Sequence, residues 1–366
     1  MSYYFFLLKA LKRYEQMHSD STSTDEPMQV FEKSGTNSKY KYVYAHAGAS
    51  GLGNRMLGIV SAFLLALLTD RVLIVYSPQY DFNKLLCDPF PHSKWILPRE
   101  VKVPGGKMID WTSFTLGLTN FYTIDEQIIQ IKDAENYFLA ELFWNKHLMD
   151  KLNQLFPSRN VGTVLFRYLI HPSNEVWAYV LQSFGGRHKD ALTIGLQIRD
   201  PMRSAVAALK CLPPLPDNTH VFIASLGSLI EEVKALHPSW QVTQRFADGA
   251  QRYDIEQMVT ALHDIFLLSM CDKVVISVRS TFGYLIMALK GSVCPIAGND
   301  VHDHGANKDA CSFPNDHEVC HHPGYIHMKR LNDSGKITYR DDLYPAAFTG
   351  PCVDFTSGIR LNTARD

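Results

Sequence analysis

Apolar runs alternate with turn residues along the first part of the chain. KYVYAHA (41–47) predicts a strand, GASGLG a tight turn, residues 55–69 a helix and VLIVY (72–76) a second strand. This order is a βαβ unit. The pattern also predicts a helix over 7–18, before a polar linker, and helical stretches over 125–131 and 135–153.

The alternation becomes regular after the polar stretch FGGRHKD (184–190). Five apolar runs predict strands: TIGLQIR, HVFIAS, WQVTQRF, DKVVISV and SVCPIAG. Helical patterns lie between them: SLIEEVKALH, residues 255–271 and TFGYLIMALKG. Strands that alternate with helices predict a parallel, doubly wound sheet. We therefore expect an α/β protein with two Rossmann-like domains facing a cleft: a helix and linker over 1–40, a first domain over 41–188 and a second over 189–366.

Two apolar stretches raise the question of a membrane. The uninterrupted apolar part of the first long helix, residues 56–68, is shorter than the roughly 20 residues that span a bilayer, so it predicts a buried core helix. The N-terminal SYYFFLLKALKR lacks a preceding basic segment and a small-residue cleavage site. We expect neither signal peptide nor anchor in the chain as written. If the protein works in the secretory pathway, its start is incomplete or it lacks its own anchor.

Composition narrows the class of protein. A chain of 366 residues with 46% hydrophobic and 20% charged residues is globular and long enough for two domains. The net charge of −1 gives no basic excess, which argues against a nucleic-acid binder.

Seven cysteines are few for this length, and four of them follow residue 291. The clustering suggests local disulfides in an oxidising lumen, with one thiol left over. The alternative is that all are buried thiols, and we favour it for Cys271, which lies within an apolar helical pattern. A single sequon, Asn332-Asp333-Ser334, fits a lumenal protein.

Three stretches are candidates for chemistry, and the first is the loop SGLGNR. Without a Cβ at Gly51 and Gly53, backbone N–H groups can approach an anionic ligand closely. Asn54 and Arg55 then begin a helix, whose dipole also favours an anion. The alternative is an ordinary glycine turn between strand and helix.

The second stretch is GLQIRDPMR (195–203), where a buried strand ends in Arg199. Ligands of open α/β sheets lie beyond the carboxyl ends of the strands. The guanidinium of Arg199 offers a bidentate fork for phosphate oxygens. The alternative is a salt bridge from Arg199 to Asp200 or to a neighbouring loop.

The third stretch is VVISVRSTFGYLIMAL (274–289). Here Arg279, Ser280 and Thr281 join a strand to a helix, which makes an N-cap and an anion site coincide. Ordinary capping would explain the two hydroxyl residues without a ligand. The same arrangement beside Arg199, on the same predicted sheet, favours a bound pyrophosphate.

Several motifs are absent from the sequence. It has no GxGxxG fingerprint, Walker loop or GxSxG elbow, and no Asp-x-Asp that would hold a divalent metal for a nucleotide-sugar enzyme. The cationic role would then fall to arginine and helix dipoles. Histidines near Cys311 and Cys320 offer a zinc alternative, but their spacing fits no standard finger and we favour a metal-free site; they are His302, His304, His317, His321, His322 and His327.

The sequence resembles the plant xyloglucan fucosyltransferase family. The resemblance is carried by SGLGNRML, AFLLALLTDRVL, LLCDPFP, IGLQIR, LLSMCD, STFGY and the Cys-Ser…Glu-x-Cys-x-His-Pro pattern of CSFPNDHEVCHHP, and ALKRYEQMH is similar to the helix that precedes the family's domain. These blocks lie in matching order from about residue 8 to residue 325. The resemblance departs in CHHPGYIHM, which lacks a further cysteine typical of this block, so the disulfide pattern is open.

The resemblance implies an inverting, metal-independent fucosyltransferase of GT-B architecture, with GDP-fucose as donor and no cofactor. Arg199 would stabilise the β-phosphate leaving group. The resemblance also implies an acceptor galactose, an α-1,2 linkage and a Golgi location. Positions that match the family's motifs and would bind the donor are Gly51, Gly53, Asn54, Arg55, Arg199, Ser280, Thr281, Phe282, Gly283 and Tyr284.

Other functions remain open at this point. A fucosyltransferase for protein or chitin-like acceptors would share the donor site and differ in the first domain. A glycan- or nucleotide-binding relative without transfer is the alternative from another class. The sequence identifies neither the acceptor, nor the general base among the Asp, Glu and His residues of the first domain, nor the oligomeric state.

Overall fold

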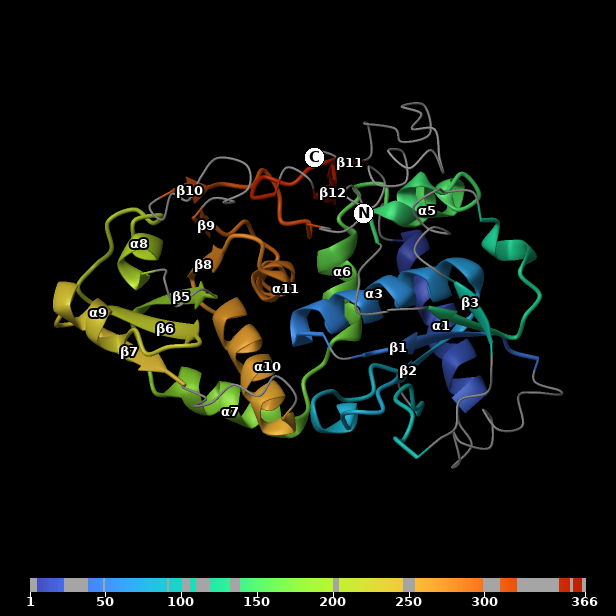
Figure 1. The fold of residues 1–366 in the computed structure, drawn as a ribbon, viewed down its shortest axis with the longest axis horizontal. Coiled ribbons are helices and arrows are strands. Elements are labelled where there is room, and N and C mark those ends of the chain that lie inside the picture. Colours follow the sequence, from blue (N-terminus) through green and yellow to red (C-terminus); the bar gives the residue numbers. More distant parts are fainter. Residues whose placement is uncertain are drawn as a thin grey trace.

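The computed structural model describes residues 5–22, 39–48, 50–90, 92–100, 106–109, 119–131, 139–199, 204–245, 254–298, 310–320, 349–355 and 358–363. These residues form two main sheets at opposite sides of the molecule, with helices between them (Figure 1). The first sheet is parallel and has the order β2-β1-β4-β3. Its strands are β1 (Tyr42–His46), β2 (Val72–Tyr76), β3 (Lys107–Ile109) and β4 (Ile128–Ile131).

The second sheet has the order β10-β9-β8-β5-β6-β7 and is parallel except for its edge pair, β9 and β10. The α/β class and the five strands predicted for this half are confirmed. The strands are β5 (Leu192–Ile198), β6 (Thr219–Ser225), β7 (Gln241–Gln244), β8 (Lys273–Ser277), β9 (Ile296–Ala297) and β10 (Cys311–Ser312), and β11 (Thr349–Pro351) pairs separately with β12 (Ile359–Leu361).

The helices cover the sheets and fill the space between them. One hydrophobic cluster runs without interruption from α3 through α6 to α10 and α11, so the two halves share a core. The α-helices are α1 (Phe5–Thr22), α3 (Leu52–Thr69), α5 (Met149–Leu155), α6 (Val161–Leu169), α7 (Asn174–Gly185), α8 (Ala205–Leu209), α9 (Ile230–Leu236), α10 (Ile255–Ser269) and α11 (Thr281–Lys290), and short 3-10 helices span Phe82–Lys84, Phe121–Thr123 and Glu141–Trp144.

Helix α3 is the central helix of the first half. Within the described residues it is the one helix whose length and apolar composition suit a membrane crossing. All of its 18 residues except Asn54 and Thr69 are nevertheless buried. The prediction of a core helix is confirmed, although the helix is longer than the apolar run of 56–68 from which it was predicted.

The segment between residues 184 and 190 joins the two halves. Helix α7 ends at Gly185, and β5 begins at Leu192. The C-terminal strands do not stay with the second sheet: Trp144 Nε1 donates to Thr349 Oγ1 at 3.3 Å, and Arg159 Nη1 donates to the Asn362 carbonyl at 3.2 Å. The domain boundary at 188/189 stays a prediction.

One predicted helix is wrong. Residues 128–131 form β4, which pairs with β1 and β3 in the interior of the first sheet. Ile128, Ile129 and Ile131 are β-branched and buried, and such side chains fit a pleated sheet better than a helix. In the other predicted stretch, 135–153, the described part contains a 3-10 helix and the start of α5.

The cysteines also depart from expectation. Cys211 pairs with Cys311, 100 residues away, and Cys320 pairs with Cys352, 32 residues away. Cys87, Cys271 and Cys294 are free, so the expectation of a single leftover thiol is wrong, whereas the buried thiol at Cys271 is confirmed. The Cys294 thiol is buried in the main core just before β9. The sequon at Asn332 lies outside the described residues.

Helix α1 covers the edge of the first sheet. The Leu73 N–H of edge strand β2 donates to the Tyr14 hydroxyl at 2.7 Å, and Nε2 of His18 lies 2.9 Å from the Leu73 carbonyl. These contacts satisfy main-chain groups that would otherwise offer a free strand edge. Burial lowers the pKa of His18 to about 4.

This buried histidine predicts a pH-dependent stability. Below about pH 6.5 the unfolded chain takes up a proton at residue 18 that the folded chain excludes, so the free energy of unfolding should fall as the pH drops toward about 4. Urea unfolding at about pH 7 and about pH 5 measures the effect. His18→Gln should reduce this pH dependence. An unchanged pH dependence in the variant would contradict the assignment.

Candidate functional site

The site lies where the two sheets face each other with their carboxyl ends. Helix α3 begins just after β1, and its N-cap, Gly51, provides no side-chain hydrogen bond. Helix α11 begins just after β8, with Ser280 as its N-cap. The first-turn N–H groups of a helix have no acceptor within the helix. Two sets of such donors, one from each half, therefore lie at these edges.

Gly53 brings the two helix N-termini into contact. A Cβ at Gly53 would lie 2.9 Å from the Phe282 nitrogen and 2.9 Å from Thr281 Oγ1, so only glycine fits against α11. Gly51 differs, because a Cβ there would meet nothing within 4 Å. We call the contact of Gly53 with Thr281 and Phe282 the helix seam.

Arg199 follows β5 and is oriented toward the start of α11. Its N–H donates to Ser277 Oγ at 3.0 Å, and its Nη1 donates to the Arg279 carbonyl at 2.9 Å. The Ser277 hydroxyl in turn donates to the Gln197 carbonyl at 2.9 Å. Hydrogen bonds thus join the carboxyl ends of β5 and β8. The sequence predicted that Arg199 lies beside the turn that follows β8, on the same sheet. Asp200, the salt-bridge alternative, lies outside the described residues, as does Arg203.

Three of the predicted site residues shape the turn. Ser280 Oγ accepts the Gly283 N–H at 3.3 Å, which is the ordinary capping considered from the sequence. A Cβ at Gly283 would lie 2.8 Å from the Ile276 Cβ, so glycine lets α11 pack on β8. Tyr284 is buried. The first-turn amides of Thr281 and Phe282 remain as donors that have no acceptor within α11.

Arg55 is fully buried behind the glycine loop, with weak partners. Its Nη1 contacts the Met258 sulfur at 3.1 Å, its Nη2 lies 3.3 Å from the Tyr80 hydroxyl, and the guanidinium stacks 4.2 Å from the Tyr80 ring. Among the described residues, its Nε has no hydrogen-bond partner. Within the described part of the chain, no carboxylate forms an ion pair with Arg55 or Arg199. A buried cation without a counter-charge is costly unless an anion binds nearby.

Asp354 is a residue of this region that the sequence analysis missed. Its Oδ2 accepts the Arg279 N–H at 2.8 Å and the Tyr284 hydroxyl at 2.6 Å. The first contact holds Arg279 in a left-handed conformation with φ 53°. Burial raises the pKa of Asp354. The one sequence feature that draws attention to Asp354 is the nearby Cys352, whose disulfide fixes the segment. A cysteine does not reveal that the segment packs on α11.

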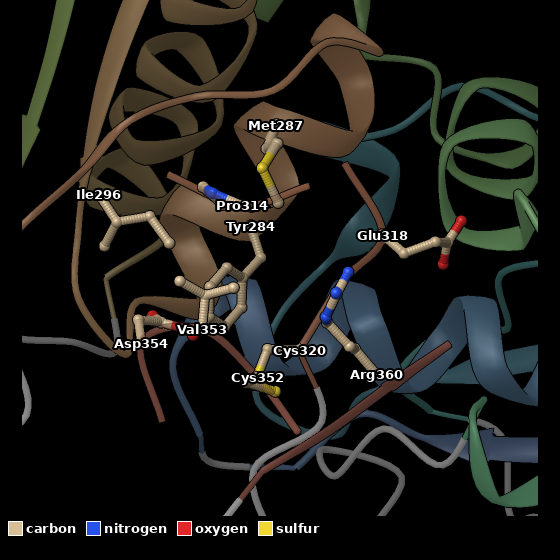
Figure 2. Close-up of a pocket in the computed structure, with 10 residues that line it drawn as sticks. All are labelled: Tyr284, Met287, Ile296, Pro314, Glu318, Cys320, Cys352, Val353, Asp354 and Arg360. Atoms are coloured by element: carbon tan, nitrogen blue, oxygen red, sulfur yellow. A yellow bond between two sulfur atoms is a disulfide. The ribbon is translucent and has the colours of Figure 1, made fainter. Parts of the chain in front are cut away.

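Figure 2 shows the gap between α11 and this C-terminal segment. Tyr284 and Asp354 line it beside the disulfide of Cys320 and Cys352. Tyr284 also belongs to the buried core, so this gap lies behind the start of α11 rather than at the helix seam. It is part of the packing that holds α11.

Most of the residues of the zinc alternative lie outside the described part of the chain. Of the six histidines named for it, only His317 lies among the described residues, where its Nε2 lies 3.2 Å from Asn160 Oδ1. The metal-free site therefore stays a prediction.

A two-sheet α/β protein with cationic side chains and helix N-termini at the facing strand ends belongs to the class that binds an anionic ligand between its halves. The sequence matches the xyloglucan fucosyltransferase family over residues 3–110, 122–211 and 225–328. The chain belongs to this family.

Relatives agree with this membership. The chain is 28% identical to a galactoside 2-alpha-L-fucosyltransferase of Pisum sativum, with 97% of this chain and 76% of the relative covered. An Arabidopsis thaliana protein of the same name is also 28% identical, with 77% of this chain and 61% of the relative covered.

Solved structures confirm the GT-B-like fold. The structure of an arginine-to-lysine variant of Arabidopsis thaliana FUT1 in complex with GDP superposes with a TM-score of 0.74 at 23% identity, covering 98% of this chain and 92% of that one. The NodZ alpha-1,6-fucosyltransferase, from Bradyrhizobium, superposes with a TM-score of 0.50 at 16% identity, covering 76% of this chain and 100% of that one.

The helix seam predicts different roles for the two loop glycines. Gly53→Ala forces a methyl group against the α11 backbone and should lower the free energy of unfolding by about 1–3 kcal/mol. Gly51→Ala, the matched control, has open space and loses only the preference of glycine at an N-cap, so it should lower the free energy of unfolding by less, about 0.5 kcal/mol. Chemical denaturation of both variants measures this difference. Equal stability of the two would contradict the seam.

The two hydrogen bonds that Asp354 accepts predict that its alanine and asparagine variants differ in stability. Asp354→Ala leaves the Arg279 N–H and the Tyr284 hydroxyl without their acceptor, which should cost about 1–3 kcal/mol of unfolding free energy. Asp354→Asn keeps one acceptor oxygen and should cost less. If both variants lost the same unfolding free energy in denaturant, the acceptor oxygen of Asp354 would not be the source of its stabilising effect.

Proposed function

We propose that this protein is an inverting fucosyltransferase that moves fucose from GDP-fucose to a hydroxyl of a glycan. Membership of the xyloglucan fucosyltransferase family supports the reaction class. The FUT1 structure with GDP and the NodZ structure soaked with GDP-fucose support the donor.

One observation carries the proposal: the positive ends of two helices meet at the seam, and no described carboxylate pairs with Arg55 or Arg199. Two like-signed helix ends that touch repel each other, and an anion that binds beside them reduces this repulsion. The diphosphate of GDP-fucose has the charge and the oxygen acceptors that such a site requires.

The proposed roles follow from the geometry. Cleavage of the bond between fucose and phosphate leaves negative charge on the β-phosphate of GDP. Arg199 and the first-turn amides of Thr281 and Phe282 would stabilise that charge, because donors fixed in advance act most strongly where charge develops. Arg55 would add positive potential from behind the glycine loop.

The remaining predicted residues would act less directly. Gly53 permits the seam, Gly51 and Asn54 present backbone and amide groups beside it, and Ser280, Gly283 and Tyr284 hold the turn. With arginine and helix dipoles supplying the positive charge, the reaction would need no metal.

The acceptor follows from the relatives. Two of them are named galactoside 2-alpha-L-fucosyltransferases, so we propose a terminal galactose and an α-1,2 linkage, as in xyloglucan. A Golgi location is proposed on the same grounds. Inversion requires the galactose hydroxyl to attack from the side opposite the phosphate. A relative that binds the nucleotide without transfer is the alternative.

The test is GDP release from GDP-fucose by the purified protein, with and without galactose-ended xyloglucan oligosaccharides. Release that the oligosaccharides stimulate, and that EDTA leaves unchanged, is expected. GDP binding without release for any oligosaccharide would favour the non-catalytic alternative. Activity lost in EDTA and restored by Mn²⁺ would contradict the metal-free reaction.

The proposed contact of Arg199 with the phosphates of GDP is tested by its alanine variant. Arg199→Ala should weaken GDP binding by more than about 1 kcal/mol, measured by calorimetry, because it removes a charged contact to phosphate. Lys273→Ala, at the opposite end of β8, is the matched control and should bind GDP as the wild type does.

A further inference from the structure

Three aromatic rings lie side by side at the carboxyl end of the first sheet. Tyr44 and His46 project from the same face of β1, and His46 pairs in register with Tyr76 of β2. The ring centroids are 6.4 Å apart for Tyr44 and His46, 6.2 Å for His46 and Tyr76, and 5.9 Å for Tyr44 and Tyr76, with interplanar angles of 21°, 28° and 31°. The three ring planes are roughly parallel to one another, and we call these three residues the aromatic surface.

The aromatic surface lies at the edge of the sheet that faces the seam. His46 and Tyr76 are the last residues of their strands, and the glycine loop that leads to the seam begins directly after β1. Within β1, Val43 and Ala45 belong to the core cluster of α3, whereas Tyr42 and Tyr44 belong to a separate cluster on the other face. A molecule on this surface would therefore lie beside the donor site without occupying it.

Parts of the aromatic surface are available to a ligand. Tyr44 is buried, but His46 and Tyr76 are only half-buried. The Tyr76 hydroxyl donates to the Arg99 carbonyl at 3.1 Å, which fixes the ring. In the described segments, neither ring nitrogen of His46 has a hydrogen-bond partner, and the ring contacts the two tyrosine rings.

We propose that the aromatic surface holds the acceptor sugar, with one ring nitrogen of His46 hydrogen-bonded to a sugar hydroxyl. A hexose has an apolar C–H face, which packs on flat aromatic rings, and a polar rim, which needs fixed hydrogen-bond partners. The surface offers both at the edge that the donor shares. This inference rests on the proposed function, since it names the subsite for the second substrate.

The test compares kinetics with galactose-ended xyloglucan oligosaccharides. Tyr76→Ala and His46→Ala should each raise the acceptor KM about tenfold while the affinity for GDP stays unchanged. Tyr76→Phe keeps the ring and should retain the acceptor KM. His46→Phe keeps stacking but removes the nitrogen, so it should lower kcat more than it raises KM.

A matched control is available in Tyr122, whose side chain is 47% exposed in a separate 3-10 helix. Tyr122→Ala should leave all constants unchanged. An unchanged acceptor KM in both alanine variants at positions 46 and 76 would overturn the proposal, and so would a parallel loss of GDP affinity, which would assign the rings to packing. Failure of the proposed function is distinguishable, because it would appear as absence of transfer in the wild type.

Discussion

The contact between the N-termini of α3 and α11 is the constraint on which the rest of the site depends. Gly53 lies against the backbone of Thr281 and Phe282 with no room for a side chain. The contact joins two positive helix ends, so packing and electrostatics oppose each other there. A diphosphate bound beside the contact, as proposed, would reduce this repulsion and would help to hold the two halves together.

Contacts far from the seam hold α11 in place. Arg167 of α6 donates to the Leu289 carbonyl at 2.8 Å and to the Lys290 carbonyl at 2.6 Å, at the end of α11. Glu318 accepts the Gly162 N–H at 2.8 Å, at the start of α6. The far end of α11 is thus tied to α6, and α6 to the segment before the Cys320–Cys352 disulfide. Asp354 completes this arrangement at the near end.

The sequence predicted β1, β2 and β5 to β9, the core helix and the position of Arg199 beside the turn that begins α11, because apolar periodicity and the ends of apolar runs are local signals. It did not predict β4, since three isoleucines in a short run fit either period. It also could not pair Cys211 with Cys311, whose separation of 100 residues only the fold brings together. Asp354 was missed for the same reason: its partners are 70 and 75 residues away.

The turn between β8 and α11 shows why motif residues and ligand-facing groups differ. Ser280, Gly283 and Tyr284 are used within the protein, as a cap, a packing space and a buried hydrogen-bond donor. The first-turn amides of Thr281 and Phe282 have no acceptor within α11 itself. Any residue supplies such an amide, so the side chains of the motif matter by fixing the backbone. Specific side chains are then needed only where charge or a sugar ring must be recognised, and these are the roles proposed for Arg199 and His46.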